Sequence, residues 1–473
     1  MDARRRPSVS ALPFGARVAI VAVLGLTGYI SVFAQAVVDA QMGSRTAITV
    51  VAPVLMVLIT TGHRNPTGGV GDAESDWIIA LLFGIACFTG IHLLGARMPT
   101  LSGLWQLQSL GFVVWFACIS TVLFGARHVV GMWKLWVFAT CCATPLPFVL
   151  VVAALSGSAG VAAVLTAVVG AVAVFLASEQ APLPHRLIAT AGCFVVSAST
   201  VTILDAHTSP LAAAVVAAGV LPVLTVVLLH TVTPATEPRP HGGSARLPRC
   251  SPLSLVALAA VAIVLVVVIH PQARPSEPSL VAADWPSRAD LGVPTYFPFI
   301  TRFLGDDSSL TRYRISGGPG QPAAAVDVIS SPNLASLDDL ADAVWYPSTH
   351  PVEYRPAPPS AHFPSGARIV HSNADAATYS GDQHWYAVTW MWRTDTAYQR
   401  VTVIVSQALD GSDIPPPPRP ISLLDTSIRP ALWTTRQQPH VDGQVDPEVI
   451  RRADDVARRL VGSFKPAGAP TGD

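Results

Sequence analysis

Long runs of apolar residues alternate with short polar segments over the first 270 residues of the chain. Most of these runs approach or exceed the roughly 20 residues that an α-helix needs to cross a bilayer. The last run, from Pro252 to His270, carries no charged residue. We therefore expect a polytopic α-helical membrane bundle of about nine spans. The expected spans cover residues 17–38, 46–62, 77–95, 104–125, 132–155, 160–178, 186–205, 211–230 and 252–270.

The hydropathy pattern changes after residue 270. Residues 271–283 are rich in proline, which is typical of an extended and solvated stalk. The remainder, 284–473, has no apolar run long enough to cross a membrane and mixes short strand-like and helix-like patterns. We therefore divide the chain into a transmembrane bundle over 1–270, a stalk over 271–283 and an α+β domain over 284–473.

The clearest pattern in the α+β domain predicts a long β-hairpin. Residues 384–393 and 397–409 are rich in β-branched and aromatic residues and flank a short turn. Alternation with a period of two places Tyr386, Trp390 and Trp392 on one face. This face is either core or a candidate binding face for a sugar, lipid or partner protein. Further strands are expected over 311–316 and 323–330, and a short helix from residue 336.

The last predicted element is a helix that begins after Asp446. Pro447 suits the first helical position, and an apolar stripe follows with helical spacing. The stripe consists of Val449, Ala453, Val456, Leu460 and Phe464. We expect this helix to pack on the sheet, with binding to the membrane surface as the alternative. A fragment over 280–465 is expected to fold by itself.

Composition and charge distribution refine the membrane assignment. The chain is 51% hydrophobic and 13% charged, and its net charge of zero gives no basic surface for nucleic acid. Eleven basic residues lie in alternate segments that include the N-terminus, and two lie in the other short loops. The eleven are Arg4, Arg5, Arg6, Arg17, Arg64, Arg127, Lys134, Arg186, Arg239, Arg246 and Arg249, and the two are Arg45 and Arg97.

This asymmetry predicts a cytoplasmic N-terminus and, with an odd number of spans, an extracytoplasmic C-terminal domain. We therefore expect a multi-pass protein of the cell membrane. Alternatively, Arg4–Arg6, the apolar run from Val18 and the triplet Ala34–Ala36 form a cleavable signal peptide. Cleavage would leave the remaining topology unchanged.

Residues that carry chemistry give few motifs. All six cysteines precede residue 271, so no disulfide is expected in the exported domain, and no pair has metal-binding spacing. The four histidines at 350, 362, 371 and 384 lack a zinc motif, and Ser372 lacks a nucleophile elbow. We assign no catalytic residue, metal or cofactor.

Polar side chains near the predicted outer ends of the spans form the one candidate site in the bundle. Burying such groups in a membrane is costly, so they often mark functional sites. They are His92, Gln106, Gln108, Asp205 and His207. They are either ordinary interfacial residues or the lining of a polar outer vestibule.

One stretch resembles a known family. Residues 124–127 (FGAR), leading to Pro145-Leu146-Pro147, resemble the region before the active site of exosortases that carry a fused accessory domain. The resemblance implies a thiol nucleophile with arginines at the outer side of the membrane. Cys193 lies near the middle of the seventh span, and neighbouring spans offer no arginine at that side. No catalytic role is carried over.

Two function classes follow from these patterns. The first is an envelope protein whose exported domain binds an envelope component, such as a protein, lipid or glycan. The second is a membrane enzyme or transporter that acts at the polar vestibule, including a divergent exosortase-like processing enzyme.

Overall fold

The chain folds into two compact units in the structure, which is a computed structural model. The helical unit comprises Met1–Leu94, Gln106–Pro145 and Ala162–Gln272. The sheet unit comprises Gly95–Trp105, Leu146–Val161 and Ala273–Asp473, and so takes in two segments from the first 270 residues. The structure describes residues 12–63, 73–204, 209–232, 251–269, 277–315, 318, 320–348, 351–358, 363–372, 384–409, 413–435 and 445–462.

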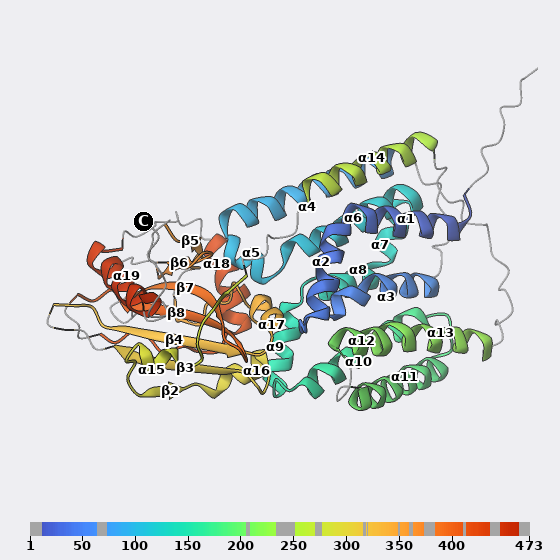
Figure 1. Cartoon of the computed structure of the whole chain (residues 1–473). Helices are drawn as coiled ribbons and strands as arrows, with labels where there is room; N and C mark the ends of the chain where they lie inside the picture. The colour runs from blue at the N-terminus through green and yellow to red at the C-terminus, as the bar shows by residue number, and fades with distance from the viewer. Residues whose placement is uncertain are drawn as a thin grey trace, which may run out of the picture. The chain divides into compact units, whose positions relative to one another are not determined.

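The helical unit consists of apolar helices (Figure 1). A helix satisfies all its interior backbone hydrogen bonds within itself, which makes it stable in lipid. The helices are α1 (Phe14–Gly28), α2 (Ile30–Gln41), α3 (Ile48–Gly62), α4 (Ala73–Arg97), α6 (Leu107–Phe124), α7 (Ala126–Gly131), α8 (Trp133–Ala143), α10 (Ala159–Ala177), α11 (Leu183–Leu204), α12 (Pro210–Ala214), η1 (Val215–Val220), α13 (Leu221–Val232) and α14 (Pro252–Val268).

Several of these helices match the dimensions of a bilayer. Among the described residues, five are long and apolar enough to cross it, or up to seven if each of two bent helix pairs forms one span. One pair is α1 and α2, which meet at 76° around Tyr29. Two further apolar helices, α3 and α14, are shorter. The chain is therefore a membrane-embedded protein, and its number of spans, expected to be about nine, stays a prediction.

The sheet unit is built on one eight-stranded sheet. The strand order is β2-β3-β4-β8-β7-β6-β5, all antiparallel, and β1 pairs in parallel with the end of β7. The strands are β1 (Ser279–Leu280), β2 (Pro294–Tyr296), β3 (Ser309–Ile315), β4 (Ala324–Ser331), β5 (Arg355–Pro356), β6 (Arg368–His371), β7 (Trp385–Arg393) and β8 (Tyr398–Ser406). The predicted hairpin is the β7–β8 pair, and its turn is closed by hydrogen bonds between Thr394 and Ala397.

The first face of the sheet is apolar and is covered by helix α19 (Pro447–Gly462), which packs on β7 and β8 (Figure 1). Asp446 Oδ1 accepts a hydrogen bond from the backbone N–H of Glu448 at 2.7 Å and so stabilises the start of the helix. Val456 and Leu460 are buried in the same cluster as Trp390. The expected docking of the terminal helix on the aromatic face is observed, whereas Phe464 lies outside the described residues.

The second face of the sheet is covered by short helices. These are α5 (Pro99–Leu104), α9 (Leu146–Leu155), η2 (Pro298–Ile300), α16 (Thr301–Leu304) and α17 (Leu334–Asp339). Leu104 and Val149 share a buried cluster with Phe303 and Leu310. Gly157 adopts φ +79°, and a side chain there would overlap the backbone of Arg302. Segments from both sides of α6 and α8 in the sequence thus complete this core.

A row of polar residues crosses the second face, one from each of five adjacent strands. Consecutive members are register partners in the sheet. We call this set the polar row, and it consists of Arg312, Asp327, Thr402, Thr389 and Arg368. The first four are buried, and their hydrogen bonds are described with the site below. No pattern in the sequence predicted this row.

Candidate functional site

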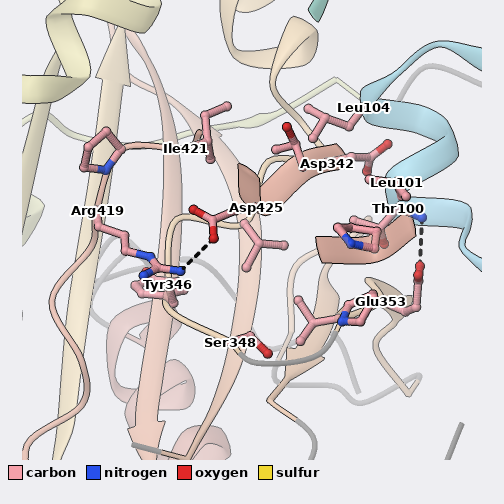
Figure 2. A pocket seen from close by; sticks show the side chains of 16 residues that line it. Thr100, Leu101, Leu104, Asp342, Tyr346, Ser348, Glu353, Arg419, Ile421 and Asp425 are labelled. Carbon is pink, nitrogen blue, oxygen red and sulfur yellow. Dashed lines mark hydrogen bonds and ion pairs between the residues drawn. The ribbon is translucent and has the colours of Figure 1, made fainter. Parts of the chain in front are cut away.

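The sheet unit contains a half-open pocket of about 90 Å³ above its second face (Figure 2). Its walls come from α5, from the segment 342–353 after α17, and from the segment 419–430. The lining residues are Thr100, Leu101, Leu104, Asp342, Val344, Tyr346, Ser348, Pro351, Val352, Glu353, Arg419, Pro420, Ile421, Asp425, Thr426 and Pro430.

Helix α5 forms one wall because both of its ends are fixed by hydrogen bonds. The backbone N–H of Thr100 donates to Glu353 Oε2 at 2.8 Å, as Figure 2 shows, and Thr100 Oγ1 accepts from the backbone N–H of Tyr354 at 2.7 Å. At the other end, Trp105 Nε1 donates to the carbonyl of Thr426 at 2.8 Å. Pro99 occupies the first turn of the helix, where no backbone donor is needed.

Asp425 organises the opposite wall. Its carboxylate accepts a hydrogen bond from Ser422 Oγ at 2.7 Å and forms an ion pair with Arg429 at 2.6 Å. Arg419 reaches the same carboxylate at 3.5 Å, a contact drawn in Figure 2. The Arg419 side chain is 41% exposed, and the long contact leaves most of its donors directed toward the pocket or solvent.

Asp342 connects the pocket to the polar row. Its Oδ1 pairs with Arg368 Nη1 at 2.7 Å, and Arg368 also donates to the carbonyl of Ala341 and lies over the ring of Tyr354. The Asp342 side chain remains 17% exposed in the pocket wall. Its position is therefore fixed by the sheet beneath it.

Tyr346 is the second connection between the pocket and the polar row. Its hydroxyl donates to Asp327 Oδ2 at 2.6 Å, and Arg312 holds both oxygens of that carboxylate at 2.7 Å. Burial and then the Asp327 carboxylate raise the pKa of the Tyr346 phenol well above its ordinary value, so the phenol stays neutral and donates. Burial alone lowers the pKa of Arg312, but its hydrogen bonds and charge interaction with Asp327 raise it overall.

The composition of the pocket favours binding of a neutral polyhydroxyl group. Three carboxylates accept hydrogen bonds and Arg419 donates them, while proline, valine and leucine side chains provide apolar walls. The lining contains no histidine, cysteine or lysine, the usual bases and nucleophiles. Among the described residues, no group of three or more His, Cys, Asp or Glu side chains could hold a metal ion.

The predicted vestibule is only partly described. His92 and Gln108 are exposed, and Gln106 is half-buried in a left-handed conformation (φ 50°) at the start of α6. Asp205 and His207 lie outside the described residues. Among the described residues, no hydrogen bond joins any two of these three side chains, and the vestibule stays a prediction.

The predicted binding face lies in the core. Tyr386, Trp390 and Trp392 are 4%, 2% and 1% exposed, because α19 and α15 (Trp285–Arg288) cover them. Trp285 packs edge-on against Trp392, with ring centres 5.1 Å apart. The structure thus assigns these side chains to packing, and a ligand has no access to them.

Sequence reasoning missed the pocket because its walls are far apart in the chain. Residues 99–104, 342–353 and 419–430 meet only through the fold. The carboxylates at 338, 339 and 342 and the Pro-rich segment 415–420 are separate local patterns in the sequence, and neither forms a binding motif by itself.

The stretch that resembles exosortases has a structural role here. Gly125 breaks the helix between α6 and α7 with φ 93°, and Asp76 Oδ1 accepts from the backbone N–H of Ala126 at 2.8 Å. Cys193 is buried, with its sulfur 3.9 Å from Ser197 Oγ. No protein-family model, curated protein or solved structure matches the chain.

Proposed function

We propose that this chain is an integral membrane protein of the cell envelope whose sheet unit binds a glycan-containing envelope component outside the cytoplasm. The observation that carries the proposal is the pocket beside α5. Three carboxylates, one arginine and several apolar side chains converge there above a buried polar row. Rigid support of this kind is what a specific polar site requires.

A sugar ring matches both the polar and the apolar side chains of this lining. Its hydroxyls both donate and accept, so they match carboxylates and a guanidinium at once, and its C–H faces match proline and valine. An anionic ligand would meet three carboxylates against one arginine in the lining. A volume of about 90 Å³ lies below that of a site for a drug-sized ligand. The pocket therefore suits a single sugar unit or the end of a longer glycan.

The location of the pocket supports an envelope ligand. Helix α5 joins α4 to α6 in the chain, and both are apolar helices long enough to span a bilayer. The pocket is thus lined by a segment only a few residues from two predicted spans. The basic-residue asymmetry supports an extracytoplasmic position for this loop.

Binding can be measured on the full-length protein in detergent. A panel of soluble fragments of envelope glycans would be tested by saturation-transfer NMR and calorimetry. Arg419→Gln and Asp342→Asn should each weaken binding about 10- to 100-fold, since a hydrogen bond to a charged group contributes about 1.5–3 kcal/mol. Asp284→Asn is the matched control, because Asp284 is exposed in the same unit and pairs only with Arg288 among the contacts described. Absence of binding by every glycan, or equal loss in the control, would reject the proposal.

Orientation can be tested separately. A reporter that is active only outside the cytoplasm should be active when fused after residue 473 and silent when inserted within 233–249. The opposite pattern would place the pocket on the cytoplasmic side and exclude an extracytoplasmic ligand.

A further inference from the structure

A helical segment of the sheet unit exposes an apolar stripe. The segment consists of η3 (Leu424–Ile428) and α18 (Arg429–Thr435). Leu423, Leu424 and Ile428 are 48%, 45% and 48% exposed, and Leu432, one turn further, is 52% exposed. We call these four side chains the leucine stripe. Removing leucine and isoleucine side chains from water is favourable, so an apolar partner is favoured.

The opposite side of the same segment faces the sheet unit. Thr426 and Pro430 are buried and line the pocket, and Asp425 is held by Ser422 and Arg429. The segment is therefore amphipathic. Asp425 and Thr426 lie toward the protein, whereas the leucine stripe lies outward beside Arg429, whose side chain is 47% exposed. Four outward apolar side chains on so short a segment are not the arrangement that suits contact with water.

One hydrogen bond locates this segment relative to the bilayer. Trp105 Nε1 donates to the carbonyl of Thr426 at 2.8 Å. Trp105 lies two residues before the start of α6 at Leu107, and α6 is one of the five helices that can span a membrane. A tryptophan at the end of a span lies at the membrane–water interface, where its ring is amphipathic. Thr426 is thus hydrogen-bonded to a residue that precedes a predicted span by two positions, and the leucine stripe begins on the same helical turn.

We infer that the leucine stripe is a membrane-contacting surface that inserts among the lipid chains at the interface. A short helix with apolar side chains on one side binds in this way when it lies parallel to the membrane plane. The continuity with Trp105 is what selects lipid over another occupant, because it places the stripe at the boundary of the hydrocarbon region. Other exposed apolar side chains of this unit, such as Val293 and Tyr296 in or beside β2, have no such connection in the contacts described. The inference does not depend on which ligand the pocket binds.

Site-specific photo-crosslinking tests this surface in the full chain. Ile428→p-benzoylphenylalanine would be expressed in native membranes, irradiated, purified and analysed by intact mass spectrometry. We expect a lipid adduct several-fold more abundant than in the control Val293→p-benzoylphenylalanine, since Val293 is 88% exposed but lies outside the stripe. The same substitution at Leu424 gives a second position on the stripe, should the Ile428 variant be poorly produced.

Each outcome has a defined meaning. Lipid adducts at the stripe positions and few at Val293 support the inference. A crosslinked dimer would instead identify a second copy of this chain as the occupant, and a protein adduct of another mass would identify a partner protein, and either would overturn it. Equal lipid adducts at the stripe and at Val293, or none at either, would also overturn it. Loss of glycan binding with retained lipid adducts would reject only the proposed function.

Discussion

The two faces of the same sheet differ in chemistry. The first face buries Trp390, Trp392 and the valines of β8 beneath α19. The second face buries an ion pair between Arg312 and Asp327, and it carries the pocket. Period-two alternation places the odd and even residues of one strand on opposite faces, so a single strand serves both. The first face is a packing surface, whereas the second positions polar groups.

The difference shows how the sheet unit can support a site. An apolar face needs only complementary volume, and it tolerates exchange among side chains of similar size. A buried polar face needs a partner for every donor and acceptor. Arg400 illustrates this, because it donates to the carbonyls of Leu337 and Leu340 at 2.9 Å each and so completes the C-terminus of α17. Arg400, two residues from Thr402 of the polar row in β8, thereby holds the end of α17, and the segment that follows forms a pocket wall.

The largest effect is expected from breaking the buried ion pair. Asp327→Ala leaves the buried Arg312 charge without its carboxylate and should lower the free energy of unfolding by about 3–5 kcal/mol. Chemical denaturation of the purified full-length protein measures this. The triple variant Arg312→Met, Asp327→Leu, Tyr346→Phe removes the pair together with its hydrogen-bond partner. Its free energy of unfolding should fall much less. A larger fall in the triple variant than in Asp327→Ala would contradict this account.

On the first face, the expected loss of stability comes from a cavity left by a truncated side chain. Leu460 of α19 is fully buried against the sheet, and Leu460→Ala should lower the free energy of unfolding by about 2–5 kcal/mol. Arg459 is exposed on the same helix, and Arg459→Ala should change stability by no more than about 0.5 kcal/mol. Equal and negligible effects of both substitutions would show that α19 does not pack on the sheet in solution.

Alkaline pH should affect the second face through Tyr346. Its pKa is raised in the folded protein by burial, so the unfolded chain releases this proton first, near pH 10. The stability that this raised pKa contributes is therefore fully present below about pH 10. It is lost as the pH rises toward the raised pKa of the folded state. Tyr346→Phe should be less stable at neutral pH by about 1.5–3 kcal/mol, because a hydrogen bond to a carboxylate is lost. It should also lose less stability than the parent protein above pH 10, and an unchanged slope would contradict the assignment.

The smallest effect is expected within the polar row. Thr402 Oγ1 donates to Thr389 Oγ1 at 3.1 Å, a bond between two uncharged groups. Thr402→Val keeps the shape and removes this donor, so stability should fall by about 0.5–1.5 kcal/mol. A loss as large as that of Asp327→Ala would show that the row acts as one coupled network.

The first face could be predicted from the sequence and the second could not. The alternation at 386, 388, 390 and 392 and the helical spacing at 449, 453, 456 and 460 are local patterns, and both correspond to buried residues. Strands β2 and β5 contain proline and are too short to give a pattern. Register partners in the polar row are 13 to 75 residues apart along the chain and become neighbours only through the sheet register.

One part of the sheet unit could not be identified from the sequence because of its apolar composition. Residues 146–155 are as apolar as any membrane helix, and the sequence placed them within a fifth span over 132–155. In the structure, Leu146, Val149 and Ala153 are buried with Ile300 and Leu310 of the sheet unit. Composition does not distinguish an apolar helix in lipid from one in a protein core. The expectation that 280–465 folds by itself stays a prediction.

The central claim is that α5 and α9 complete the second face and its pocket. The direct measurement compares a fragment over 273–473 with the full chain by amide hydrogen exchange, with mass spectrometry resolving each strand. We predict that β7 and β8, covered by α19, keep part of their protection in the fragment. We predict that β3 and the segment 342–353 lose theirs, because Leu310 and Glu353 lack the α9 and α5 contacts. Equal protection of both regions in the fragment and in the full chain would contradict the account.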